Sequence, residues 1–382
     1  MPSDLRGSGE IPAAGAAANP PLVIEPPSPK WLLRLFLIPF LIMVMIIGSM
    51  LLMSLFSKLA GSQPNIDQAI ADLKDESGGQ RTAEWFVGPA AKQRYIAATA
   101  IAEQIKAGMT QEQRIKLAAD LLDILDHHTR PNEGDVEYWV LLALGRVWQV
   151  DSSQPPMNSP QAVESRQRVV AKLIEHARTR ELYPKTAVEL ANLPDSALKD
   201  YRKQEMDRRK AAILALRVWK GRDEARDAFP TLISILKDGK EDLDVRMAAA
   251  MTLGPLANPA DRDVIDALTW TMDNCGQDEL IWDTAAALAQ LNQPSAKPTI
   301  LMLLDRNTLG SRMIDDVETG QRRQLTQAEQ QRILCNTMKA ARFLKLPEIK
   351  ARLDQIAAGD PSELVRQCAR DVLSGQADHG EQ

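Results

Sequence analysis

Small and hydrophobic residues recur along most of the chain with the period of an α-helix. The clearest case is residues 244–256, DVRMAAAMTLGPL, where spacings of four, four and three separate Val245, Ala249, Leu253 and Leu256. This spacing puts the four side chains on one face of a helix, and the alanines let a neighbouring helix approach closely. Because a single helix cannot bury such a face, the pattern predicts a core of stacked helices.

The same pattern returns elsewhere at constant offsets. Residues that match the 244–256 helix are Arg94, Ala97 and Ile101 at an offset of 152, Asp135, Val136, Leu144 and Gly145 at 109, Arg209, Ala212 and Leu216 at 37, and Val365, Arg366, Ala369 and Leu373 at 120. Two weaker copies, which begin at Ile281 and Ile333, keep the apolar face but lack the Val-Arg pair. Constant offsets across a whole helix are typical of a structural repeat.

A second amphipathic segment follows each of these helices except the last. These segments cover residues 110–127, 159–178, 223–237, 261–273, 294–304 and 347–358. Several begin with helix-start signals: Thr110 precedes Gln113 as in a capping box, Ser159 precedes Pro160, and Asp261 precedes a periodic segment. The sequence therefore predicts units of helix, turn and helix, and essentially no strand. Longer intervals predict insertions at residues 181–204 and 306–328.

The N-terminal part has a different pattern. Residues 1–30 are rich in Pro and Ala without apolar periodicity, which predicts a disordered tail. Residues 35–56 contain no charged residue, and this length spans the hydrocarbon core of a bilayer, so we predict one transmembrane helix at 31–57. A cleaved signal peptide is the weaker alternative, because the apolar run is too long. We expect a linker with an initial helix at 58–90 and a disordered tail at 376–382.

Two observations bear on which side of the membrane the repeats face. Lys30 and Arg34 flank the N-terminal end of the apolar run, which favours an internal N-terminus and external repeats in a single-pass cell-membrane protein. The three cysteines, Cys275, Cys335 and Cys368, show no disulfide or CxxC spacing, which suits a reducing compartment equally well. We expect the cysteines to fill core positions.

The Asp-Val-Arg start, the small-residue face and the Leu-Gly end of the repeat resemble those of the HEAT-repeat family. The resemblance covers residues 91–375 and implies an all-α fold, an α-solenoid of stacked helical hairpins. It also implies an extended surface of second helices that holds other proteins. The arrangement of tail, single span and repeats resembles bacterial single-pass membrane proteins with a HEAT-repeat domain. The tetratricopeptide pattern, with its strict interval of 34, is missing.

Candidate chemical sites are few. No HExxH, GxSxG, GxGxxG or Walker sequence occurs. Asp123 and His127 have a spacing that could serve a metal, but a solvated histidine at a helix end is the better interpretation, and His128 and His176 share it. The net charge of -5 argues against nucleic acid. A partner-facing basic patch is predicted from two clusters, which comprise Arg166, Arg168, Lys172, Arg202, Lys203 and Arg208.

These patterns predict a membrane-anchored scaffold that mediates protein–protein interaction. We expect a protein partner, contact with the lipid bilayer through residues 35–56, no catalytic residues, and no metal, cofactor or small-molecule ligand. The alternative is an accessory subunit or an enzyme with a site built on the insertions at 181–204 or 306–328. A deep pocket with convergent titratable groups in these insertions would favour the enzyme, and a shallow groove the scaffold.

Overall fold

The computed structural model describes residues 66–74, 89–105, 109–129, 134–149, 158–180, 194–315 and 321–375. All of them lie in the second of two units, Met1–Ser62 and Gln63–Gln382. The predicted tails at 1–30 and 376–382 and the predicted membrane helix at 31–57 therefore lie outside the described residues. Within the described ranges, no helix combines the length and apolar character needed to cross a bilayer.

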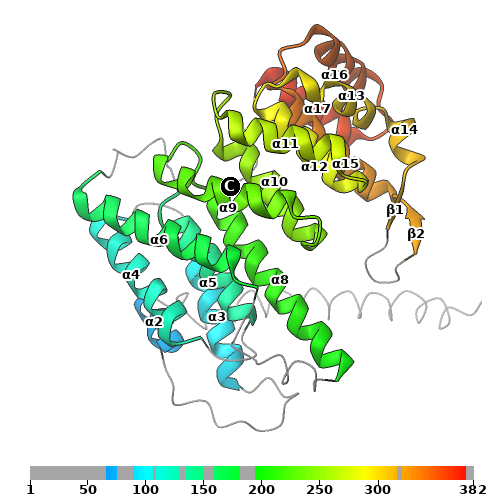
Figure 1. Cartoon of the computed structure of the whole chain (residues 1–382). Helices are drawn as coiled ribbons and strands as arrows, with labels where there is room; N and C mark the ends of the chain where they lie inside the picture. The colour runs from blue at the N-terminus through cyan, green and yellow to red at the C-terminus, as the bar shows by residue number, and fades with distance from the viewer. Residues whose placement is uncertain are drawn as a thin grey trace, which may run out of the picture. The chain divides into compact units, whose positions relative to one another are not determined.

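The described part is almost entirely α-helical, as the sequence predicts (Figure 1). The repeated alanine-faced segments form seven of the described helices, here called the first row: α3 (Pro89–Gln104), α5 (Gly134–Val147), α8 (Asp195–Arg217), α10 (Leu243–Leu256), α12 (Asp278–Gln290), α15 (Gln327–Ala341) and α17 (Glu363–Ser374). Each of these helices packs against the next along the chain. The repeated apolar face is buried there, with Val245, Ala249 and Leu253 fully inaccessible.

The second amphipathic segments also form helices. With the initial helix predicted within 58–90, they make the second row: α2 (Ile66–Lys74), α4 (Gln111–His127), α6 (Pro160–Arg178), α9 (Phe229–Lys237), α11 (Arg262–Asn274), α13 (Lys297–Leu303) and α16 (Pro347–Gly359). Short 3-10 turns, Asp223–Ala228 and Pro294–Ala296, precede α9 and α13. Two predicted start signals are confirmed: Thr110 and Gln113 form a reciprocal capping box, and Ser159 caps α6 ahead of Pro160.

The pairing of the two rows differs from the prediction. Each unit was expected to pair a first helix with the second helix after it, whereas α2 packs on α3, α4 on α5, α6 on α8, α9 on α10, α11 on α12 and α16 on α17. Helix α13 contacts both α12 and α15. The last helix, α17, therefore has a partner in α16, and α2 is the partner of α3.

A repeated arginine supports four of these six helix pairs. It lies on a first-row helix and donates a hydrogen bond to a backbone carbonyl at the C-terminal end of the preceding second-row helix. The pairs are Arg94 with Leu73, Arg209 with Ala177, Arg246 with Leu236 and Arg366 with Asp360. Carbonyls in the last turn of a helix lack partners within the helix and carry partial negative charge, so a cation there is stabilising.

Two predictions about irregular regions need correction. Strands β1 (Met313–Asp315) and β2 (Arg322–Gln324) form an antiparallel hairpin, although essentially no strand was expected. This hairpin and α14 (Arg306–Gly310) both lie within the 306–328 insertion. The 181–204 insertion is described only from residue 194, and residues 195–204 are the first turns of α8 rather than an irregular segment. Short strands of this kind have too few residues for an alternating pattern to show.

Candidate functional site

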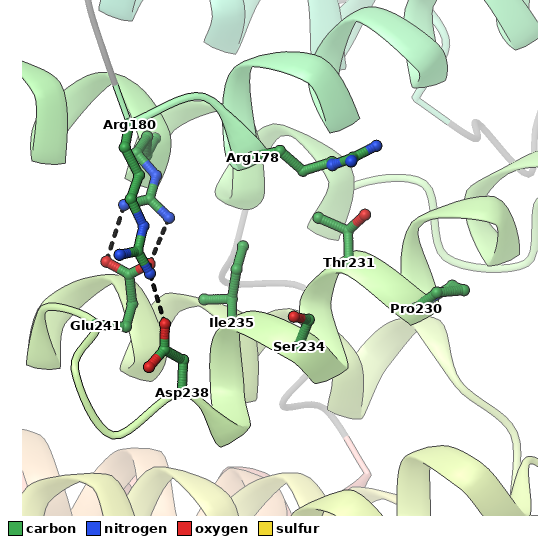
Figure 2. A pocket seen from close by; sticks show the side chains of 9 residues that line it. Arg178, Arg180, Pro230, Thr231, Ser234, Ile235, Asp238 and Glu241 are labelled. Atoms are coloured by element: carbon green, nitrogen blue, oxygen red, sulfur yellow. Dashed lines mark hydrogen bonds and ion pairs between the residues drawn. The ribbon is translucent and has the colours of Figure 1, made fainter.

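A cavity of about 440 Å³ opens between α6 and α9 in the second row (Figure 2). Its walls come from the C-terminal end of α6, from α8, from α9 and from the turn after α9. The lining residues are Arg178, Arg180, Arg209, Pro230, Thr231, Ser234, Ile235, Asp238 and Glu241. Three arginines and two carboxylates make this lining strongly polar.

One end of the cavity is a closed network of ion pairs. Arg209 donates to both carboxylate oxygens of Glu241 at 2.8 and 2.6 Å, and also binds the carbonyl of Ala177 at 2.9 Å. Arg180 reaches Asp238 at 2.5 Å and Glu241 at 3.2 Å. Burial is the largest single influence on Glu241 and opposes its charged form, but the hydrogen bond and charge of Arg209, the backbone N–H of Asp242 and the charge of Arg180 together lower the pKa of this carboxyl. This end therefore holds α6, α8 and α9 together.

Arg178 occupies the other side of the cavity and has no such network. Its side chain is exposed, and no hydrogen bond or ion pair joins it to any residue that the structure describes. Figure 2 shows it directed away from Arg180 and Glu241, on the side of Thr231. A second cavity of about 390 Å³ adjoins the same arginine and is lined by Ala171, Ile174, Glu175, Arg178 and Thr179. Arg178 is thus shared by two cavities.

The predicted basic patch does not form as one surface. Arg166 is buried and pairs with Glu224 at 2.7 Å, with Trp148 beneath its guanidinium. Arg208 is also buried and donates to the carbonyl of Thr179. The prediction that these two arginines face a partner is therefore wrong. Both lie at the edge of a buried apolar helix face, which the sequence pattern did not distinguish from an exposed face.

The remaining members of the predicted patch are accessible to different degrees. Lys172 lies between Asp126 at 2.6 Å and Glu175 at 2.8 Å, and Lys203 pairs with Asp207 at 3.1 Å. Arg168 and Arg202 are exposed on α6 and α8. Only these two combine exposure with the absence of a pairing carboxylate among the described side chains.

The histidines lie in charged surroundings. His127 contacts Asp123 at 3.1 Å, and Lys74 holds the same carboxylate at 2.9 Å, so this aspartate serves as an ion-pair partner at the end of α4. His176 differs from its predicted solvated state: it is buried, with Nδ1 3.1 Å from the buried carboxylate of Glu137. Among the described residues, no three His, Cys, Asp or Glu side chains are grouped as metal ligands.

One partly buried acid stands outside these networks. Asp283 lies on α12, and its Oδ2 is buried without a hydrogen-bond partner. Burial raises the pKa of this carboxyl to about 7, although the charges of Arg217 and Arg332 act in the opposite direction. No pattern in the sequence indicated the burial of this carboxylate oxygen of Asp283.

The three cysteines are partly buried free thiols, and Cys368 points toward the carbonyl of Cys335.

Comparison of the chain with models of protein families, with curated proteins and with solved structures finds no match. The resemblance to HEAT repeats therefore remains a prediction based on the repeated residues. The sequence pointed to the second helices as the binding surface but did not single out Arg178. The one signal for Arg178 in the sequence was an arginine at the C-terminal end of an amphipathic segment. Cations are common at that position.

Proposed function

We propose that this chain is a membrane-anchored scaffold, a HEAT-like α-solenoid that binds another protein through its second-row helices. One observation carries the proposal. Consecutive first-row helices are packed against one another through small residues, whereas the second row exposes two open cavities around Arg178, which has no hydrogen-bond or ion-pair partner among the described residues. Exposed, adaptable surfaces on a rigid scaffold are where binding residues are usually found.

Support for the membrane anchor comes from the sequence. The uncharged run at residues 35–56 is long enough to span a bilayer, and its flanking Lys30 and Arg34 favour an N-terminus inside and repeats outside. Carbonate washing of membranes tests the anchor: the full chain should stay in the pellet and dissolve only in detergent. Protease added to intact cells tests the orientation, and complete protection of the repeats would contradict the external placement.

Described side chains of the 306–328 insertion are occupied with structural contacts. Arg306 binds both carboxylate oxygens of Asp360, at 3.0 and 2.7 Å. Arg323 does the same with Glu329, at 2.8 and 2.7 Å. These pairs hold α14 and the hairpin to the neighbouring helices. We therefore propose binding, rather than catalysis on this insertion, as the function of the chain.

Site-specific photo-crosslinking in the native cells tests the scaffold proposal. A crosslinker at Ser234, exposed on α9, should capture a discrete protein from detergent extracts of the full chain. The same crosslinker at Arg332, exposed on α15 of the first row, serves as the matched control. Equal capture at both positions, or none at Ser234 and at neighbouring second-row positions, would contradict binding through the second row.

A further inference from the structure

We propose that Arg178 binds the carboxylate of an acidic residue in an extended segment of a partner protein, and that an apolar neighbour of that residue fills the adjoining cavity. This inference rests on the proposed scaffold function and specifies its contact site. The two cavities that Arg178 lines provide the two subsites.

Charge balance identifies the first subsite as one that binds an anion. The 440 Å³ cavity is lined by three arginines and two carboxylates, so its lining carries one excess positive charge (3 − 2). Arg180 and Arg209 are engaged by Asp238 and Glu241, which leaves the excess charge on Arg178. A planar guanidinium binds a carboxylate through two parallel hydrogen bonds, and such charge-assisted pairs are the stronger kind.

The floor of this cavity supplies further donors. Thr231 and Ser234 lie on α9 below Arg178, with their side chains toward the cavity (Figure 2). Neither hydroxyl is hydrogen-bonded to a residue that the structure describes. Both can therefore donate to a carboxylate that Arg178 holds. A doubly charged phosphate fits less well, because Asp238 and Glu241 line the same cavity and one excess positive charge cannot neutralise it.

The second subsite has a different character. Ala171 and Ile174 supply an apolar wall, and the carboxylate of Glu175 is already bound by Lys172 at 2.8 Å. An acidic side chain would meet Glu175 here, whereas an apolar one would bury surface against Ile174. Both cavities adjoin one residue, so a ligand that uses them must pass Arg178. A short segment of extended chain does this, and a small free acid does not.

Fluorescence anisotropy with short labelled peptides tests this site on the full chain in detergent. The probe is fluorescein-Ser-Gly-Leu-Glu-Gly-Ser, compared with versions that carry Gln or phosphoserine in place of Glu. We expect the Glu peptide to bind best and Arg178→Gln to weaken it about tenfold or more, the effect of losing one charge-assisted pair. The affinity of Arg178→Lys for the Glu peptide should lie between those of the unchanged chain and Arg178→Gln, because lysine keeps the charge but cannot donate two parallel hydrogen bonds.

Arg168→Gln is the matched control, because Arg168 is exposed on the same helix and lines neither cavity. It should leave the affinity within about twofold, and thermal unfolding of both variants should match the unchanged chain. Equal losses for the two variants, equal binding of the Gln peptide, tighter binding of the phosphoserine peptide, or full competition by free glutarate would each overturn the proposal.

The crosslinking experiment separates this inference from the scaffold function. If capture at Ser234 persists while the Glu peptide fails to bind, Arg178 is not the contact and the scaffold proposal stands. If no second-row position captures a protein, the function itself fails. Capture at Ser234 that Arg178→Gln lowers and Arg168→Gln leaves unchanged would support both.

Discussion

The contacts within the first row and the surface between α6 and α9 are built in opposite ways. A Cβ atom on Gly145 of α5 would lie 2.6 Å from the carbonyl oxygen of Ala215 on α8, and one on Gly254 of α10 would lie 2.8 Å from Cα of Ala287 on α12. Between α6 and α9, by contrast, about 440 Å³ stays open. The first-row contacts at these glycines leave no room for a larger side chain, whereas exposed side chains between α6 and α9 can change without disturbing that packing.

The sharpest test of this contrast compares the two arginines of the cavity. Arg209→Met leaves Glu241 buried without its main partner, and loss of one member of a buried pair costs about 3 kcal/mol. Arg178→Met should change the free energy of unfolding by about 0.5 kcal/mol or less, because Arg178 is exposed and is bonded to no side chain that the structure describes. Urea unfolding followed by circular dichroism measures both.

Acid titration adds a second measurement to this pair. The pKa of Glu241 is lowered in the folded chain, so its ion pair stabilises the protein above the ordinary glutamate pKa and this stabilisation is lost as the pH falls. The stability difference between Arg209→Met and the unchanged chain should therefore shrink toward pH 3. A difference independent of pH would show that Glu241 is not the cause.

A smaller effect is expected within the first-row contact. Gly145→Ala should cost about 2 kcal/mol, because the new methyl group meets backbone of α8 that cannot rotate away. Gly276→Ala is the control, since nothing lies within 4 Å of a Cβ at that position. Its effect should be near zero or slightly stabilising. Similar melting temperatures for the two variants would contradict the claim that the contact between α5 and α8 leaves no room for a methyl group.

The smallest effect concerns the unpaired acid of α12. The folded pKa of Asp283, about 7, lies above the ordinary value of 3.8, so this group lowers stability as the pH rises between these values. Asp283→Asn should therefore stabilise the chain by about 1.5 kcal/mol at pH 8 and have little effect at pH 4, since part of the gain is offset by the buried amide. Thermal unfolding at both pH values measures it, and equal effects at the two would rule out ionisation as the cause.

The sequence was sufficient for the local structure of both rows. Period, capping residues and small-residue faces located the helices, because these signals depend on neighbours three or four positions away. The pairing of the rows was not predictable in this way. The pairing depends on contacts such as that of Arg209 with Ala177, which are 32 residues apart. The local pattern is the same whether a first-row helix packs on the second-row helix before it or on the one after it.

Burial of polar side chains was the main gap in predicting the site. Arg166 and Arg208 carry the same charge as Arg168 and Arg202, yet the first two are inside and the others are exposed. A long cationic side chain can run along an apolar surface to reach a carbonyl or carboxylate, so residue type alone does not place it. Arg178 was missed for the same reason, since its lack of partners among the described residues is visible only in three dimensions.

The repeated arginine also bears on how the chain folds during synthesis. Arg366 reaches back six residues to Asp360, Arg246 ten to Leu236, Arg94 21 to Leu73 and Arg209 32 to Ala177. A ribosome adds such lengths within seconds, on the order of 5 to 20 residues each second. These four helix pairs can thus form soon after their arginine leaves the exit tunnel, without waiting for the C-terminal half of the chain to be synthesised.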